Sequence, residues 1–230
     1  MYNTPAHHIT SSASPVAMPW ENLSGSNAHE CKVQAHEALF CEGDDAEFLY
    51  EVVEGVMCNY RILMDGRRQI ISFAYPGDVI GLGQTETYRY SCEAVCGSKV
   101  RSISKGALMR DALGHADLGH RLFEIATSEL ASMQEHQLLL GRKSAVEKLA
   151  SFLLVLARKA CREDDKEASF KVPMTRTDIA DYLGLTIETV SRSMTKLKLS
   201  GVIDLPQTTT VRVRDMLRLE ELAEGDDCTF

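Results

Sequence analysis

The spacing of hydrophobic residues changes along the chain, and each change indicates a different kind of structure. Between residues 29 and 112, short apolar runs are separated by turn signals such as Gly43-Asp44 and Asp65-Gly66. Two apolar runs within residues 60–73 flank Asp65-Gly66, which is a strong hairpin signal. Short strands at regular spacing with such turns predict a small β-barrel or β-sandwich.

The period becomes helical in residues 115–140, which contain no proline. One stripe alternates in steps of three and four, the heptad spacing of paired helices. This seam consists of Phe123, Ala126, Leu130, Met133, Gln137 and Leu140. A second stripe, Leu118, Leu122 and Ile125, lies alongside it near the start. We expect one stripe to pack on the chain's own barrel and the other on a second copy, as a parallel two-helix dimer. The alternative is that both stripes pack within one chain.

Residues 142–162 predict a second helix with a broad buried face. The face consists of Val146, Leu149, Ala150, Leu153, Leu154, Leu156 and Ala157. A charged turn at residues 163–168 separates this helix from a strand-like run at residues 170–172.

Residues 175–197 carry the most informative pattern in the chain. Thr175 followed by Asp178 is a capping box that begins one helix, and Gly184 can take the left-handed conformation that ends it. Thr186 then caps a second helix. The apolar positions expected to hold the two helices together are Ile179, Ala180, Leu183, Leu185, Val190, Met194 and Leu197. Because caps, turn glycine and apolar positions agree over the whole segment, it predicts a helix-turn-helix.

The residues that face away from this apolar stripe suit the major groove of DNA. Arg192 can donate two hydrogen bonds to a guanine edge, and Glu188 can accept one from a cytosine amino group. Ser191 can donate, accept or contact a thymine methyl group. A second set is predicted to hold phosphates, two of them at helix N-termini: Thr175, Arg176, Thr186, Thr189 and Lys196. A helix-turn-helix that contacts only protein is the alternative.

The rest of the chain completes the pattern at both ends. Residues 200–214 predict a two-stranded wing, and Asp215 begins a short last helix that runs through Leu222. Residues 1–28, rich in Ser, Ala, Pro and Asn, predict a flexible arm, and residues 223–230 predict an acidic tail.

Strands, a long helix, a helix-turn-helix and a wing, in that order, resemble the CRP/FNR superfamily of bacterial transcription regulators. The resemblance covers roughly residues 30–222 and is most specific in DIADYLGLTIETVSR, residues 178–192. It implies an α+β fold with a β-roll of the jelly-roll type, a dimerisation helix and a winged helix-turn-helix. The implied division is an arm at 1–28, the β-roll at 29–114, the dimerisation helix at 115–141, the DNA-binding domain at 142–222 and the tail at 223–230. In that family the Glu, Ser and Arg of ETVSR, here Glu188, Ser191 and Arg192, read a TTGA-type half-site.

Two departures narrow the resemblance. Members that bind cyclic AMP carry Gly-Glu-Leu and then Arg-Ser in the phosphate pocket, whereas this chain has Gly81-Leu82-Gly83-Gln84 and Tyr88-Arg89-Tyr90-Ser91. Oxygen-sensing members hold an iron–sulfur cluster through clustered N-terminal cysteines and one in the barrel. Here the first 40 residues contain only Cys31, and Arg101 stands where the barrel cysteine would be.

What remains resembles the FixK group, which activates genes for low-oxygen respiration and nitrogen fixation. The resemblance therefore implies no cofactor, no metal, and three partners: double-stranded DNA, RNA polymerase and a second copy of the chain. The main alternative is a regulator of the same family whose β-roll binds an effector such as haem or nitric oxide, with His29, His36 and Cys58 as possible ligands.

Composition adds a compartment and excludes several function classes. The seven cysteines form no CxxC pair, and no secretory signal or apolar run of membrane length occurs, so we expect free thiols in the cytoplasm and no membrane contact. Oxidation of a thiol such as Cys161, placed just before the DNA-binding elements, is a side hypothesis. No nucleophile elbow, phosphate loop or HExxH motif occurs, so no catalytic residue and no enzyme activity are predicted.

The net charge of −8 initially argues against DNA binding, but the charge is unevenly distributed. Residues 171–214 carry seven Lys and Arg against four Asp and Glu, a net charge of +3. Residues 215–230 carry one Arg against six carboxylates, a net charge of −5. The chain is therefore expected to present a basic DNA-facing segment on an acidic body.

Overall fold

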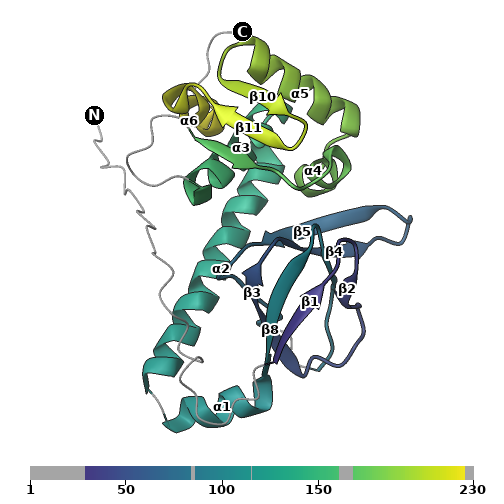
Figure 1. The fold of residues 1–230 in the computed structure, drawn as a ribbon, viewed down its shortest axis with the longest axis vertical. Helices are drawn as coiled ribbons and strands as arrows, with labels where there is room; N and C mark the ends of the chain where they lie inside the picture. Colours follow the sequence, from purple (N-terminus) through teal and green to yellow (C-terminus); the bar gives the residue numbers. More distant parts are fainter. Residues whose placement is uncertain (1–28, 84–85, 115, 161–167, 226–230) are drawn as a thin grey trace.

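The fold was analysed in a computed structural model that describes residues 29–83, 86–114, 116–160 and 168–225 (Figure 1). The predicted N-terminal arm, Cys161 and the last five residues of the predicted acidic tail lie outside the described residues. None of the helices in these four ranges combines the length and apolar character needed to cross a bilayer.

The N-terminal half is a β-roll made of two four-stranded antiparallel sheets. The first sheet has the order β1 (His29–Val33), β8 (Ser98–Ser104), β3 (Phe48–Glu54) and β6 (Val79–Ile80). The second has the order β2 (Ala38–Phe40), β7 (Ser91–Ala94), β4 (Met57–Ile62) and β5 (Arg68–Ala74). One apolar cluster takes residues from both sheets, among them Val52, Met57, Cys92 and Val100. The predicted roll of short strands is confirmed.

The hairpin between β4 and β5 follows the predicted turn. The Leu63 N–H donates to the Arg67 carbonyl at 2.8 Å, and the Gly66 N–H donates to the Leu63 carbonyl at 2.9 Å. Gly66 has φ 82°, a conformation that residues with a side chain rarely adopt. The hairpin extends from the roll beneath the C-terminal helices (Figure 1).

A helix follows the last strand of the roll, where the sequence predicted strands and turns. This helix, α1 (Lys105–Gly114), begins directly after β8, so the all-β reading of residues 29–112 is wrong at its end. Leu108 is the fully buried side chain described in α1, where it packs beside Leu49 and Ile103. Such a helix has no repeated apolar stripe that the sequence could display.

The two predicted stripes of the long helix α2 (Ala116–Arg142) differ in their surroundings: one packs on the roll and the other is mostly exposed. Leu118 is 2% exposed and packs with Leu122 and Ile125 against Leu49 and Ile103 of the chain's own roll. The heptad seam is mostly open: Phe123 is 68%, Leu130 57% and Met133 51% exposed in the single chain. Ala126 and Gln137 are also exposed, whereas Leu140 is half-buried.

The C-terminal half combines four helices with a small antiparallel sheet. Its elements are α3 (Ala145–Ala160), β9 (Ser169–Lys171), α4 (Arg176–Leu183), α5 (Ile187–Leu199), β10 (Ile203–Gln207), β11 (Thr210–Val213) and α6 (Met216–Glu224). The sheet has the order β10-β11-β9, and Asp215 caps α6 as predicted.

The second helix starts later than the sequence analysis placed it, at Ala145 rather than Arg142. Lys143 and Ser144 interrupt the helical path, so α2 and α3 are separate elements. The Ser144 N–H donates to the Glu147 carboxylate at 2.9 Å, and the Glu147 N–H donates back to the Ser144 hydroxyl at 3.5 Å. This Ser-x-x-Glu capping box was visible in the sequence and was missed.

We expect Leu118→Ala to destabilise the chain by about 2–5 kcal/mol, because truncation leaves a cavity between α2 and the roll. Leu217→Ala is the matched control, since Leu217 is exposed on α6 and its loss should change stability by less than about 0.5 kcal/mol. Urea unfolding measures both. Equal stability of the two variants would contradict the packing of α2 on the roll.

Candidate DNA-binding site

The first helix of the predicted helix-turn-helix starts with the expected capping box. The Thr175 hydroxyl accepts a hydrogen bond from the Asp178 N–H at 3.1 Å. In return, one Asp178 oxygen accepts from the Thr175 N–H at 2.9 Å and from the Thr175 hydroxyl at 2.7 Å. This reciprocal pair satisfies donors at the start of α4 that have no partner inside the helix.

The turn after α4 also follows the sequence. Gly184 has φ 62° and ψ 43°, the left-handed conformation that ends a helix, and its N–H donates to the Ala180 carbonyl. Thr186 then caps α5 by accepting from the Thr189 N–H at 3.2 Å. Leu185 is half-buried, so it is less enclosed than the predicted plug.

The second helix, α5, has one buried side and one open side, as predicted. Its buried side consists of Val190, Ser193, Met194 and Leu197. Ser193 was not expected there. Its open side carries Glu188, Ser191, Arg192, Thr195 and Lys196, all exposed, whereas Thr189 is half-buried. The three predicted base-reading residues therefore lie together on the first half of an exposed helix face.

The electrostatics of this face suit base recognition. The pKa of the Glu188 carboxyl is lowered by its own backbone N–H, by the Thr186 hydroxyl and by the charge of Arg192. Glu188 is therefore an ionised acceptor at neutral pH. Arg192 lies one turn later and donates to the Thr189 hydroxyl at 3.4 Å, a long contact that a base edge can replace. The face thus offers one strong acceptor and one forked donor.

The predicted phosphate contacts lie at the starts of α4 and α5 and further along α5. The Thr186 and Thr189 hydroxyls are 3.0 Å apart and exposed enough to meet a phosphate. Burial lowers the pKa of the half-buried Arg176, which still leaves a cation. The Thr175 hydroxyl donates its hydrogen to Asp178, so a phosphate contact there would have to replace that bond.

A feature that the sequence did not reveal is a groove between the β4–β5 hairpin and the helix-turn-helix. We call α4, the turn after it and α5 the reading unit. The groove has a volume of about 590 Å³, and its lining includes Arg67 and Gln69 from the hairpin and Gly184, Thr186 and Thr189 from the reading unit. The β-roll therefore approaches the start of α5, although the two segments are more than 100 residues apart.

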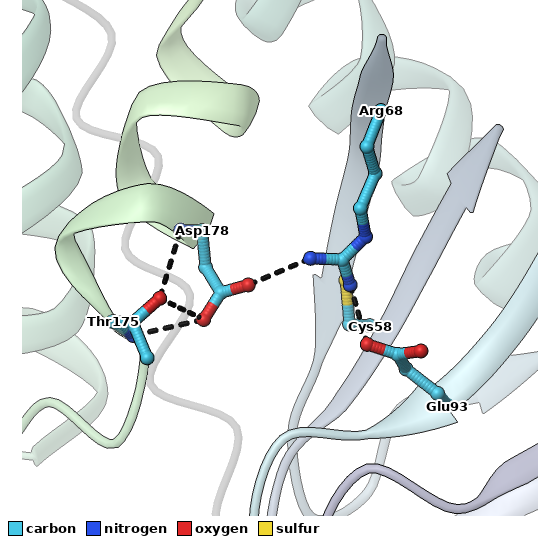
Figure 2. A network of polar contacts seen from close by, with 5 residues as sticks. All are labelled: Cys58, Arg68, Glu93, Thr175 and Asp178. Atoms are coloured by element: carbon cyan, nitrogen blue, oxygen red, sulfur yellow. Dashed lines mark hydrogen bonds and ion pairs between the residues drawn. The ribbon is translucent and has the colours of Figure 1, made fainter. Parts of the chain in front are cut away.

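Arg68 of β5 joins the two halves of the chain directly (Figure 2). One guanidinium nitrogen lies 2.8 Å from an Asp178 oxygen on α4, and another lies 2.5 Å from a Glu93 oxygen on β7. Next to it, the Gln69 side chain donates to the Asp181 backbone carbonyl at 2.6 Å. No local pattern in the sequence pointed to these contacts.

A second contact joins the long helix to α4. The His136 ring of α2 stacks on Tyr182 of α4, with ring centroids 4.2 Å apart and an interplanar angle of 14°. The Phe73 ring of β5 lies against the same tyrosine, with ring centroids 5.2 Å apart. Burial and the nearby charge of Lys148 lower the pKa of His136, so the stacked imidazole is neutral at pH 7.

This histidine predicts an acid-dependent loss of stability. Because the folded pKa is lowered, the unfolded chain binds a proton more readily, and stability falls as pH drops below the ordinary histidine pKa of about 6.5. The loss continues down to the lowered folded pKa. We expect His136→Phe, which keeps an aromatic ring, to lose less stability than the parent chain between about pH 7.5 and about pH 5.5.

Thermal unfolding at both pH values measures the effect. His120→Phe is the control, because His120 is exposed on the same helix and its Nδ1 lies 3.4 Å from the Glu124 carboxylate. If His136→Phe and His120→Phe show the same pH dependence, the buried stack is not its source.

Aromatic side chains pack in the interior of the β-roll. Phe40 and Tyr88 stack there with centroids 3.7 Å apart, and the Tyr88 hydroxyl donates to the Phe48 carbonyl at 2.6 Å. The Tyr90 hydroxyl accepts from the Gly81 N–H at 3.2 Å, at the glycine stretch that holds the phosphate in cyclic-AMP-binding members. Among the described residues no Lys or Arg is fully buried, and the Lys105 ammonium lies 5.3 Å from the Tyr88 ring centroid.

The suggested effector ligands are not brought together either. His29 lies on β1 and His36 in the following turn, both exposed, whereas Cys58 is fully buried on β4 of the other sheet. Burial raises the pKa of the Cys58 thiol to about 12, which disfavours the thiolate that binds metals. Within the part of the chain that the structure describes, no three His, Cys, Asp or Glu side chains form a group able to hold a metal ion.

Comparisons with known proteins agree with this geometry. The family described as the cyclic nucleotide-binding domain matches residues 30–110, and the Crp-like helix-turn-helix domain matches residues 147–222. The transcriptional activatory protein AadR of Rhodopseudomonas palustris is 41% identical over 187 residues, covering 81% of this chain and 78% of AadR.

Two FixK proteins extend the comparison. The nitrogen fixation regulation protein FixK of Azorhizobium caulinodans is 43% identical over 183 residues, covering 78% of this chain and 74% of FixK. The solved structure of FixK2 from Bradyrhizobium japonicum superimposes with a TM-score of 0.79 at 36% identity, covering 85% of this chain and 96% of that chain. These relatives, together with a β-roll followed by a Crp-like helix-turn-helix, show that the chain belongs to the FixK-like group of the CRP/FNR family of transcription regulators.

Proposed function

We propose that the chain is a homodimeric transcriptional activator that reads a TTGA-type palindrome at genes for low-oxygen respiration and nitrogen fixation. The observation that carries the proposal is the exposed face of α5, where Glu188, Ser191 and Arg192 lie beside one another. The names of the relatives support the gene class, because FixK proteins regulate nitrogen fixation and AadR is a transcriptional activatory protein. Activation also implies contact with RNA polymerase, in the cytoplasm where the DNA lies.

Each base-reading residue has a role that follows from its chemistry. Arg192 donates two hydrogen bonds to a guanine edge, Glu188 accepts from a cytosine amino group, and Ser191 contacts a neighbouring base. The phosphates on either side are held by Thr175, Arg176, Thr186, Thr189 and Lys196. The net charge of +3 on residues 171–214 favours DNA on this segment of the otherwise acidic chain.

The open seam of α2 is the surface on which two copies pair. Large apolar side chains are exposed in heptad register at Phe123, Leu130 and Met133. Burying this row against a second copy is favourable, because apolar surface is then removed from water. Ala126, Gln137 and Leu140 complete the seam. Pairing around a two-fold axis presents two reading helices about 34 Å apart, which is one turn of DNA.

The protein binds its site without a cyclic nucleotide or an iron–sulfur cluster. Phe40 and Tyr88 stack in the apolar core of the roll. The domain boundaries follow the same scheme: a β-roll at 29–114, a dimerisation helix at 115–141 and a DNA-binding domain at 142–222. A gel-shift experiment with the purified chain and no added effector tests this proposal directly, because binding to the palindrome is expected without additions.

Arg192→Ala tests the base-reading face. We expect specific binding to weaken by about 1–3 kcal/mol, with relaxed preference at the contacted base pair, because a bidentate contact to guanine is lost. Fluorescence anisotropy with the TTGA-type palindrome and with point variants of it measures both effects. Arg158→Ala is the control, since Arg158 is exposed on α3 and pairs with Glu220. An equal loss on random DNA would assign Arg192 to the phosphates instead.

Leu130→Glu tests the dimer seam. Two glutamates facing each other across the helix pair repel and desolvate, so we expect the variant to sediment as a monomer at concentrations where the parent chain is a dimer. Leu217→Glu is the matched control, because Leu217 is equally apolar and exposed but lies on α6. A dimeric Leu130→Glu variant would show that the copies pair through another surface.

A further inference from the structure

We propose that Arg68 is a positioning residue that fixes the direction of the reading unit relative to the β-roll and thereby sets the half-site spacing that the protein accepts. Arg68 is on β5 and is attached to the reading unit by its ion pair with Asp178 of α4. The inference rests on the proposed dimer and its palindromic site.

The contact is a fork between two carboxylates from different parts of the chain (Figure 2). The guanidinium lies 2.8 Å from Asp178 and 2.5 Å from Glu93, and the three side chains are 23%, 12% and 20% exposed, respectively. The Tyr60 ring lies under the guanidinium at 4.5 Å, and the Cys58 sulfur accepts a further contact at 3.5 Å. A planar cation held on three sides has one preferred orientation.

Asp178 divides its two oxygens between the two halves of the chain. One oxygen accepts both hydrogen bonds from Thr175 and so forms the start of α4. The other accepts from Arg68. The same carboxylate therefore begins the helix and attaches it to the roll. Although burial opposes ionisation, the bonds from Thr175 and Arg68 outweigh it and lower the pKa of Asp178, so the attachment is charged at neutral pH.

Further contacts hold α4 along the rest of its length. The Gln69 amide donates to the Asp181 carbonyl at 2.6 Å, and the Lys148 ammonium of α3 donates to the Leu183 carbonyl at 3.3 Å. These bonds hold the middle and the end of α4, whereas Arg68 holds its start. A rigid helix fixed at its start and further along cannot swing, and α5 packs directly on α4.

In a dimer this attachment has a consequence for DNA. Each reading unit takes its direction from its own roll, and the two rolls are joined through α2. The distance between the two reading helices is then a property of the folded dimer rather than of the DNA. Loss of Arg68 leaves α4 and α5 intact but removes the charged contact at the start of α4, so Gln69 and the shared apolar core hold the direction less tightly and the protein should tolerate half-sites at altered spacing.

The test compares Arg68→Ala and Arg68→Lys with Arg61→Ala in the full chain. Arg61 is the matched control, because it lies on the neighbouring strand β4 and pairs with Glu42 rather than with the reading unit. The probes are the palindrome, the same palindrome with its spacer changed by one or two base pairs, and a single half-site. Anisotropy gives each affinity, and thermal unfolding shows that each variant is folded.

We expect the parent chain and Arg61→Ala to discriminate strongly against altered spacers. Arg68→Ala should reduce that discrimination by about fivefold or more, which is the size of change expected when a coupling between two sites is lost. The affinity for a single half-site should stay unchanged. Arg68→Lys should fall between them, since an ammonium cannot hold both carboxylates as a planar fork.

Two results would overturn the inference in different ways. Equal weakening on every probe, with the parent's discrimination retained, would mean that Arg68 contributes only to stability. If the parent chain itself binds the palindrome no better than the half-site, the proposed dimeric function fails first, and the inference falls with it.

Discussion

The orientation of the DNA-reading helices depends on the packing of one face of the β-roll against the C-terminal half. The outer side of the second sheet contributes Cys58, Ile70 and Phe73 to an apolar cluster that also contains Leu153 of α3 and Ile179 of α4. The opposite side of the same sheet faces the roll interior, where Met57 and Cys92 lie. Alternation along β4, and along β5 on either side of its register shift opposite Asn59 and Tyr60, gives one sheet two buried faces. The roll and the reading unit therefore share a core.

Apolar packing alone leaves a helix some freedom to slide and rotate, because dispersion and the hydrophobic effect have little direction. The polar contacts at the edge of the shared core remove that freedom. Arg68 with Asp178, and Gln69 with the Asp181 carbonyl, hold fixed positions on β5 against fixed positions on α4. A partly buried ion pair adds little net stability, since desolvation offsets the attraction, but it strongly disfavours arrangements in which one charge is left unpaired. The charged contacts thus specify an orientation that the apolar core stabilises.

The sequence predicted best those features whose signals are local. The Thr175 capping box, the Thr186 cap and Gly184 lie within a few residues of the backbone groups that they satisfy, and the apolar stripe of α5 repeats within one helix. The structure reproduces all of them. The Asp65-Gly66 hairpin is local in the same sense. The helix α1 was missed because its described side chains include a single buried apolar residue, Leu108, which gives no period. The break between α2 and α3 was predicted, but it was placed before Arg142 rather than at Lys143 and Ser144, although Ser144 and Glu147 signal its position.

Contacts between distant segments could not be predicted in this way. Arg68 and Asp178 are 110 residues apart, and each has a plausible local role, one in a hairpin strand and one in a helix cap. Only the fold shows that one carboxylate serves both. The same holds for His136, whose position in the helical pattern gives no hint that its ring stacks on Tyr182.

The two stripes of α2 explain why these distant contacts bear on function. The stripe that includes Leu118 packs the helix against the roll, and the His136 ring, further along the same helix, stacks on Tyr182 of α4. The other stripe is exposed in the single chain. The helix therefore contacts both the roll and the reading unit, and its exposed stripe is the surface proposed for the second copy. The surface between β5 and α4 is where the roll and the reading unit meet through charged and hydrogen-bonded contacts, so a change there would alter the direction of α5.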